Sequence, residues 1–185
     1  MPRSFKKDDL RVQKTVSALL AAICVLLDKR NFIHITVNDI CEEAQISRAT
    51  FYAHYNDKYD LLEDWLRNLN MESIIGENPT YAQIEKSVNE FVRQYEQVIK
   101  NIVEDANTET LTLLYQWLLS KAAIMYENGN GTPPDAHNIV LSNFYAGGLI
   151  WYLTWHVSHK FPSDIQVMNQ ELSSMLAYLL RWDEK

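Results

Sequence analysis

Apolar residues recur every three to four positions along most of this chain, which is the spacing of amphipathic α-helices. The first such stripe runs from about Asp8 to Asn31 and ends in Lys29 and Arg30, cations that suit a helix C-terminus. Further stripes follow at residues 36–44, 47–55, 57–69, 84–102, 111–125, 136–158 and 163–179. We find neither the alternating pattern of a β-strand nor an internal repeat, so we predict an all-α fold.

Two loop signals interrupt the helical pattern. Met71–Thr80, with the sequence MESIIGENPT, contains Gly76 and Pro79, and Glu127–Pro134 carries two glycines and two prolines. We place a domain boundary at the first of them. The predicted organisation is an N-terminal domain over residues 1–70 and a helical C-terminal domain over residues 71–185.

Two short helices near the N-terminus are separated only by Gln45 and Ile46. The first begins at Thr36, which forms a capping-box pattern with Asp39, and the second begins after Ser47, a favourable N-cap residue. Two short helices that meet at a tight turn and dock onto a third are typical of an element that enters a DNA groove.

The second short helix has a buried side and an outward side. Phe51 and Tyr55 share the buried side, because successive residues are about 100° apart around a helix. The other positions form the outward side and its edges, namely Ala49, Thr50, Tyr52, Ala53 and His54.

The segment ITVNDICEEAQISRATFYAHYNDKYDLL resembles the helix-turn-helix of the TetR family of transcriptional regulators, and its core ISRATFYAHYNDK is the most specific part. The resemblance covers roughly the first third of the chain. It implies a three-helix head whose second motif helix lies in the major groove, in a homodimer that reads a near-palindromic operator. It also implies a C-terminal domain for effector binding and dimerisation. Many family members have glycine where this chain has Ala49.

Carried onto this sequence, the resemblance implies a set of DNA-contacting residues. They are Thr36, Ser47, Arg48, Ala49, Thr50, Tyr52, Ala53, His54 and Lys58 in the motif, with Lys6 and Lys7 in a basic arm before it. Arg48 can fork onto a guanine edge or hold a phosphate, and the methyl groups of Ala49 and Thr50 can touch thymine.

The net charge of the whole chain is −7, which by itself disfavours binding to DNA phosphates. Binding therefore requires a local surface with positive charge. Residues 1–60 hold nine lysines and arginines against eight acids, whereas the rest of the chain holds eight against sixteen. Affinity is therefore expected to depend on a few placed cations. Tyr52, His54 and Lys58 are expected to clamp phosphates. The alternatives are that Tyr52 packs against the first motif helix and that His54 is a solvated surface residue.

Aromatic residues are the one chemical clue in the C-terminal domain. They would suit the walls of a pocket for an uncharged or aromatic effector, and the alternative is that they simply fill the core. The pocket candidates are Phe91, Tyr95, Tyr115, Trp117, Phe144, Trp151 and Tyr152.

Gly147 and Gly148 lie inside a long predicted helix, where glycine costs about 1 kcal/mol relative to alanine. Close approach of another helix would offset this cost, either in a four-helix dimer interface or against a bulky neighbour within one subunit. The predicted interface comprises Gly147, Gly148, Trp155, Leu172, Met175, Leu176 and Leu179.

Several other functions are disfavoured. Cys24 and Cys41 lack a CxxC partner, so we interpret both as core residues, with redox sensing as the alternative. His156 and His159 have no fixed third ligand, so neither a metal nor a cofactor is expected. We find no catalytic motif and predict that the chain is not an enzyme. No apolar run approaches the roughly 18 residues of a membrane span, and no signal peptide is recognised, so we predict a cytoplasmic protein.

The leading hypothesis is a homodimeric TetR-like transcriptional regulator, usually a repressor, that binds operator DNA and is released by a small-molecule effector. An effector that prefers one spacing of the two heads would weaken operator binding by its differential affinity for the two states. The alternative hypothesis is a coactivator or adaptor of the same fold, which acts through a protein partner docked on the acidic C-terminal domain.

Overall fold

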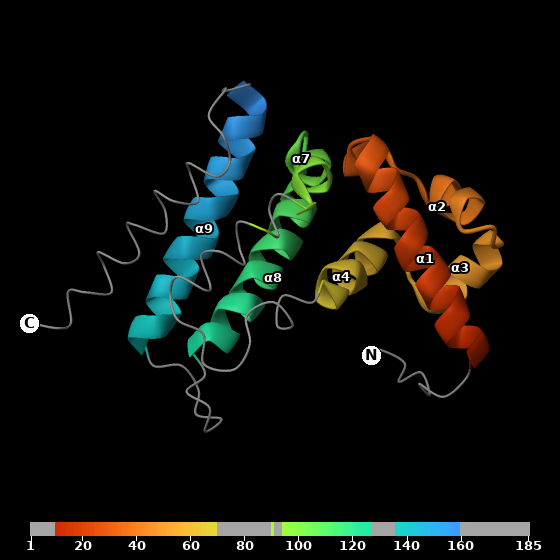
Figure 1. Ribbon diagram of the computed structural model, residues 1–185, viewed down its shortest axis with the longest axis horizontal. Coiled ribbons are helices and arrows are strands. Elements are labelled where there is room, and N and C mark those ends of the chain that lie inside the picture. The colour runs from red at the N-terminus through yellow and green to blue at the C-terminus, as the bar shows by residue number, and fades with distance from the viewer. Residues whose placement is uncertain (1–9, 70–89, 91–93, 127–135, 160–185) are drawn as a thin grey trace, which may run out of the picture.

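The computed structural model describes residues 10–69, 90, 94–126 and 136–159, and the regular elements in these ranges are all helical. This confirms the predicted fold class. The elements are α1 (Leu10–Lys29), the 3-10 helix η1 (Phe32–His34), α2 (Val37–Glu43), α3 (Arg48–His54), α4 (Lys58–Asn68), α7 (Glu96–Val103), α8 (Thr108–Tyr126) and α9 (Ala136–His159). Helices α1 to α4 form a head at one end of the molecule, and α8 and α9 lie side by side at the other (Figure 1).

The head is built around one apolar core. Helix α1 packs against α2 and α4, and α2 packs against α3. The stripe predicted for the first helix supplies Leu19, Ile23 and Leu27, which are fully buried. Phe51 of α3 is buried to the same degree, so the predicted inward side of that helix is confirmed.

Helix α1 is long and apolar enough to cross a membrane by length and composition alone, with a mean hydropathy of 1.7 over its best window. No uninterrupted apolar run within it reaches the roughly 18 residues of a membrane span, so no span was predicted there. Its apolar side chains form the centre of the head core, and this packing accounts for the composition of the helix.

The short helices α2 and α3 begin at the predicted caps. The Thr36 backbone N–H donates to the Asp39 carboxylate at 2.8 Å, and the Asp39 N–H donates back to the Thr36 hydroxyl at 3.2 Å. The Ser47 hydroxyl accepts the Thr50 N–H at 3.1 Å. These bonds satisfy backbone donors that a seven-residue helix otherwise leaves exposed, which fixes where each helix begins.

The turn between α2 and α3 requires a left-handed residue. Gln45 has a φ of 55°, and the N–H of the next residue, Ile46, donates to the Cys41 carbonyl at 3.0 Å. This bond closes the C-terminus of α2 before Ser47 begins α3.

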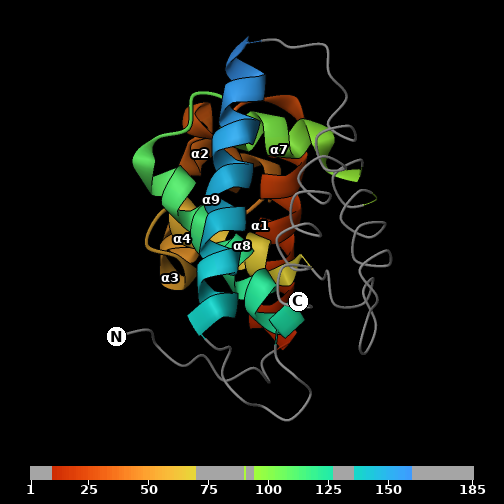
Figure 2. The same ribbon diagram turned by 90° about the vertical axis from the view of Figure 1, so that its left-hand side faces the viewer.

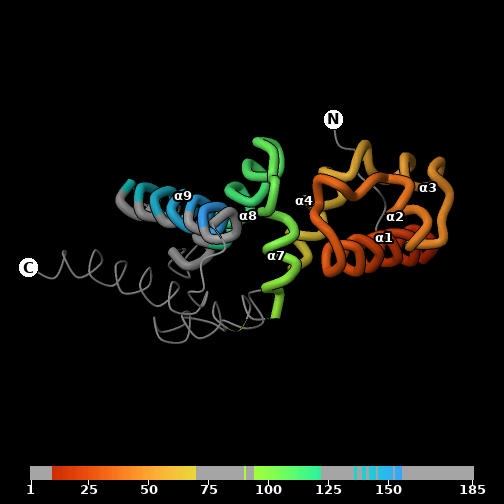
Figure 3. The backbone as a smooth tube through the Cα atoms, turned by 90° about the horizontal axis from the view of Figure 1, so that it is seen from above, coloured from red at the N-terminus to blue at the C-terminus, as the bar shows by residue number. Residues whose placement is uncertain are grey.

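Helices α4 and α7 join the head to the α8–α9 pair (Figure 3). Val98 and Ile102 of α7 belong to the same buried cluster as α1, so the head core continues into the second half of the sequence. The buried Asn101 amide donates to the Leu27 carbonyl at 2.7 Å. The Asn107 amide donates to the Tyr59 hydroxyl at 2.8 Å and so ties the start of α8 to α4.

Most of the helix boundaries agree with the sequence predictions. Helix α9 spans the predicted segment, and the turn before α8 is present, with Asp105 at a φ of 59°. The prediction of one helix from residue 84 to 102 is wrong, because Tyr95 has a non-helical backbone and α7 begins after it at Glu96. The predicted loops at 71–80 and 127–134, the domain boundary and the last helix lie outside the described residues.

Candidate nucleic-acid interface

Helix α3 presents an outward surface of small and flat side chains. Ala49 and Ala53 are exposed, and Tyr52 is 49% exposed beside the fully buried Phe51. The Tyr52 ring meets the Phe51 ring edge to face at a centroid distance of 5.4 Å. Small residues allow a helix to approach DNA bases closely, because they add little bulk between the backbone and the groove floor.

The caps position this surface. The Ser47 and Thr50 hydroxyls are 2.8 Å apart, and the Thr36 hydroxyl also contacts the Asp39 carboxylate at 2.7 Å. The capping contacts lower the pKa of Asp39 to about 2, with the Thr36 hydroxyl and N–H as the largest causes and Arg30 next. Thr36, Ser47 and Thr50 therefore first hold the two short helices in place.

Arg48 stands at the start of α3 with neutral partners. Its Nη1 donates to the Asn38 side-chain oxygen at 3.2 Å, and its Nη2 donates to the Tyr52 hydroxyl at 3.4 Å. The guanidinium lies 5.8 Å from the Tyr52 ring centroid, within cation–π range. Asn38 was not predicted as a site residue, because its contact with Arg48 depends on how the turn folds.

Lys58, which the sequence predicted to clamp a phosphate, is directed into the head. Its ammonium donates to the backbone carbonyls of Phe32, Ile33 and Ile35 at 3.0, 2.9 and 2.9 Å. An ammonium has three donors, so none is left for a phosphate. Burial lowers the pKa of Lys58, and the ammonium also lies 4.7 Å from the centroid of the Phe32 ring. Lys58 closes the loop after α1 from inside, and in this arrangement none of its donors is directed outward toward a phosphate.

Two further cations of the head are paired with acids. Arg30 forms a salt bridge with Asp39 at 2.9 Å, and Arg67 is paired with Glu63 one turn earlier in α4. Such pairing reduces the charge available to DNA. Arg48 differs because its partners are uncharged, and it also lies on the outward helix. His54 is half-buried at the end of α3, and Lys6 and Lys7 lie outside the described residues.

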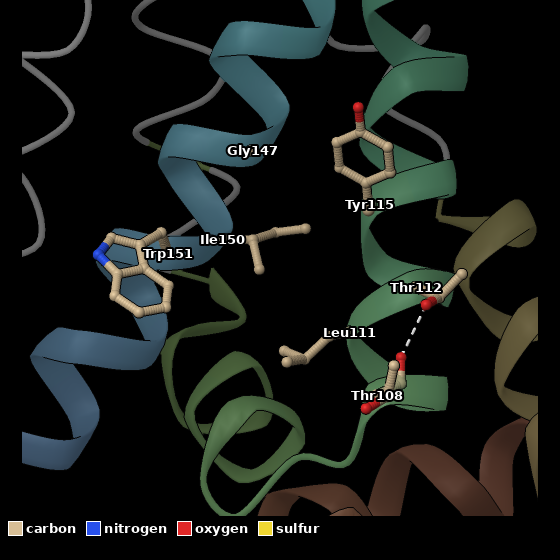
Figure 4. A pocket seen from close by; sticks show the side chains of 7 residues that line it. All are labelled: Thr108, Leu111, Thr112, Tyr115, Gly147, Ile150 and Trp151. Carbon is tan, nitrogen blue, oxygen red and sulfur yellow. Dashed lines mark hydrogen bonds between the residues drawn. The ribbon is translucent and has the colours of Figure 1, made fainter.

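A depression with a volume of about 270 Å³ lies between α8 and α9 (Figure 4). Leu111 and Ile150 point into the space between the two helices. The lining residues are Thr108, Leu111, Thr112, Tyr115, Gly147, Ile150 and Trp151. The Tyr115 hydroxyl donates to the Asn143 side-chain oxygen at 2.5 Å, which bridges the two helices.

The predicted pocket residues separate into different environments. Tyr115 and Trp151 line the depression. Tyr95 packs edge to face on Trp65 of α4 at 6.2 Å, and Trp117 packs against the head core. Phe144 is 63% exposed on α9 and does not line the depression. Phe91 and the side chain of Tyr152 lie outside the described residues.

The two glycines of α9 have different surroundings. A Cβ atom at Gly147 would lie 4.0 Å from the Tyr115 ring, so this position faces a bulky neighbour within the chain. A Cβ at Gly148 would meet nothing within 4 Å. Several large apolar side chains of α9 are exposed, namely Ile139, Val140, Phe144, Trp151 and Trp155. Leu172, Met175, Leu176 and Leu179 lie outside the described residues.

The two cysteines lie in apolar surroundings. Cys41 is buried and Cys24 is half-buried against the same core. Burial raises the pKa of both thiols, which disfavours the reactive thiolate. This supports their interpretation as core residues.

Helix α3 is short, is capped at its start and follows α2 after a tight turn. Its outward side carries Arg48, whose hydrogen-bond partners are neutral. This arrangement defines a helix-turn-helix head. Comparison with known proteins agrees. Residues 19–64 match the model of the family described as "Bacterial regulatory proteins, tetR family". The chain is also 38% identical over 87 residues to YxbF of Bacillus subtilis (strain 168), an HTH-type transcriptional regulator. That match covers 46% of this chain and 22% of YxbF.

Solved structures share the fold over nearly the whole chain. A TetR transcriptional regulator from Streptococcus agalactiae 2603V superimposes with a TM-score of 0.60 at 22% identity, covering 91% of this chain and 96% of that one. The dihydroxyacetone kinase operon activator DhaS superimposes with a TM-score of 0.55 at 17% identity, covering 90% and 96%. Residues 19–64 thus carry a helix-turn-helix of the TetR type, as the sequence resemblance predicted. This agrees with the prediction that it is not an enzyme.

Proposed function

We propose that this chain is a cytoplasmic transcriptional regulator that binds double-stranded operator DNA with α3 in the major groove. The observation that carries the proposal is Arg48, a cation with neutral partners at the start of an exposed helix that otherwise presents alanines and a tyrosine. A guanidinium in this position suits a guanine edge or a phosphate at the rim of the groove. Lys58, by contrast, directs its ammonium at backbone carbonyls.

The regulator is proposed to act as a homodimer. The support is the exposed apolar surface of α9, where Phe144 is 63% and Trp151 is 75% exposed. Helix α9 lies in front of α8 in the view of Figure 2. Large apolar side chains at such exposure commonly mark an interface. Two joined heads would double the DNA contacts, which matters because residues 1–60 hold only one more lysine or arginine than acids, nine against eight.

The depression between α8 and α9 is proposed to receive an apolar or aromatic effector that weakens operator binding. Its support is position: the depression begins at Thr108, directly after Asn107, whose amide holds Tyr59 of α4. A ligand that prefers one arrangement of α8 would shift α4 and with it the head. In this scheme the unliganded dimer represses transcription.

Selection of duplexes from a random-sequence pool, followed by fluorescence anisotropy, tests the DNA-binding proposal. We expect one near-palindromic sequence to be enriched and the affinity to fall steeply with salt. Arg48→Ala should weaken binding by at least about tenfold and reduce the salt slope. Lys100→Ala, which removes the same charge from an exposed position on α7, is the matched control and should leave binding within about twofold. Absence of enrichment at low salt would overturn the proposal and point to an adaptor.

A further inference from the structure

Asn38 lies on α2 and contacts α3, the helix that we propose reads the DNA and that is called the reading helix below. It is the second residue of α2, and its side-chain oxygen accepts from Arg48 across the turn of the motif at 3.2 Å. Arg48 is the first residue of α3. The contact therefore bridges the two helices at the point where the motif faces outward.

The guanidinium of Arg48 is held from two directions. Asn38 binds Nη1 from α2, while Tyr52, one turn further along α3, lies beside Nη2 at 3.4 Å and presents its ring face at 5.8 Å. A free arginine side chain loses considerable rotamer entropy when it docks on a base. A guanidinium that is already oriented loses less of this entropy. Its contact with DNA is therefore stronger, and its N–H groups point in a defined direction.

Asn38 and Tyr52 hold the Arg48 guanidinium without neutralising its positive charge. Arg30, by contrast, is paired with the Asp39 carboxylate at 2.9 Å. Asparagine and tyrosine accept a hydrogen bond without carrying a negative charge. Of the five N–H donors of Arg48, two are engaged by Asn38 and Tyr52, and three remain. A guanine edge needs two donors to be read at O6 and N7.

We propose that Asn38 is a specificity-determining residue that positions Arg48 to read a guanine. The proposal rests on the DNA-binding function proposed above and adds a role for a residue on the non-reading helix. Asn38 acts through Arg48, so its effect on base choice exists only while Arg48 is present.

A double-mutant cycle on the selected duplex tests this. The four proteins are the wild type, Asn38→Ala, Arg48→Ala and the double variant. Each is measured on the selected duplex and on duplexes in which each guanine of a half-site is replaced in turn. At one guanine, replacement should weaken binding by the wild type but not by Arg48→Ala. That guanine is the one contacted by Arg48.

Asn38→Ala is expected to reduce discrimination at that guanine by about three- to tenfold in the wild-type background and to change nothing in the Arg48→Ala background. Asn38→Asp separates geometry from charge, since it keeps an acceptor of the same shape but pairs Arg48 with a carboxylate. It should retain discrimination while lowering affinity for all duplexes alike. Both positions are exposed, and unchanged circular dichroism and melting temperature will show that the variants fold.

Two results would overturn the proposal. Equal losses from Asn38→Ala with and without Arg48 would show that Asn38 contacts DNA itself. Unchanged discrimination in Asn38→Ala would show that the contact positions nothing. Failure of the proposed function is distinguishable from both, because then the selection would enrich no sequence and no guanine could be assigned.

Discussion

The head and the α8–α9 pair bury their apolar surface to different extents. In the head, the large apolar side chains on the inward sides of α1, α3 and α4 are almost completely buried, and α7 completes the same core. Helix α9 leaves Val140, Phe144 and Trp151 more than 60% exposed. The head is thus sealed within one chain, while the pair presents an apolar face outward.

This difference shows where each part gets its stability. The head has capped helices, a left-handed turn residue and an internal lysine that binds three carbonyls, all from within about 60 residues of sequence. The α8–α9 pair is tied to the head by Asn107 and bridged internally by Tyr115 and Asn143. The head is therefore expected to behave as a fixed reading unit, and the pair as the part that responds to partners.

The largest effect should follow from breaking the head core. Phe51→Ala removes a fully buried ring, and loss of its burial together with the remaining cavity should lower the free energy of unfolding by about 3–5 kcal/mol. The adjacent Tyr52→Ala, at 49% exposure, is the matched control and should cost less than about 1 kcal/mol. Urea denaturation followed by circular dichroism measures both. Equal losses would show that the head is not sealed as described.

The contrast between the two parts also explains how far the sequence could be interpreted. Thr36 and Ser47 cap α2 and α3 as predicted, because capping depends on residues only three positions apart. The outward side of α3 followed from helical periodicity in the same way. Local rules therefore predicted the head well.

Contacts between distant residues were not predictable in this way. Lys58 lies next to a motif that resembles a DNA-binding one, yet its partners are carbonyls 23 to 26 residues earlier. Aromatic residues of the C-terminal region share the same spacing whether they line a depression, as Trp151 does, or contact α4, as Tyr95 does. Which of these two environments an aromatic residue occupies depends on how the helices pack, and a local sequence pattern does not show this.

A smaller effect is expected from a charge on the exposed face of α9. Phe144→Glu should dissociate the proposed dimer, because a carboxylate buried in an apolar interface without a partner is costly, and we expect the dissociation constant to rise by about 100-fold. Analytical ultracentrifugation gives the mass. Val25→Glu introduces the same group at an exposed apolar position of α1 in the head and should leave the mass unchanged. A monomeric wild type, or a Phe144→Glu protein that stays dimeric, would place the interface elsewhere or remove it.

The smallest effect concerns Asp39, whose carboxylate caps α2 and pairs with Arg30. Its pKa is lowered to about 2 in the folded head, so the folded state favours the charged form. A lowered pKa stabilises the fold above the ordinary aspartate value near 4, and this contribution is lost as the pH falls from about 4 to about 2. Asp39→Asn should cost about 1 kcal/mol at pH 7, a cost that shrinks toward pH 2, when unfolding is measured in urea across this range.

The exposed Glu42→Gln, on the same helix, is the control for the general effect of removing an acid and should stay within about 0.5 kcal/mol of the wild type.

Because the cap fixes the start of α2, and Asn38 on α2 holds Arg48, the same protonation should also loosen the reading surface. DNA binding at pH 7 should therefore weaken more in Asp39→Asn than in Glu42→Gln, although both variants remove one negative charge and would otherwise bind DNA more tightly. Tighter binding by Asp39→Asn would show that the cap does not position the motif.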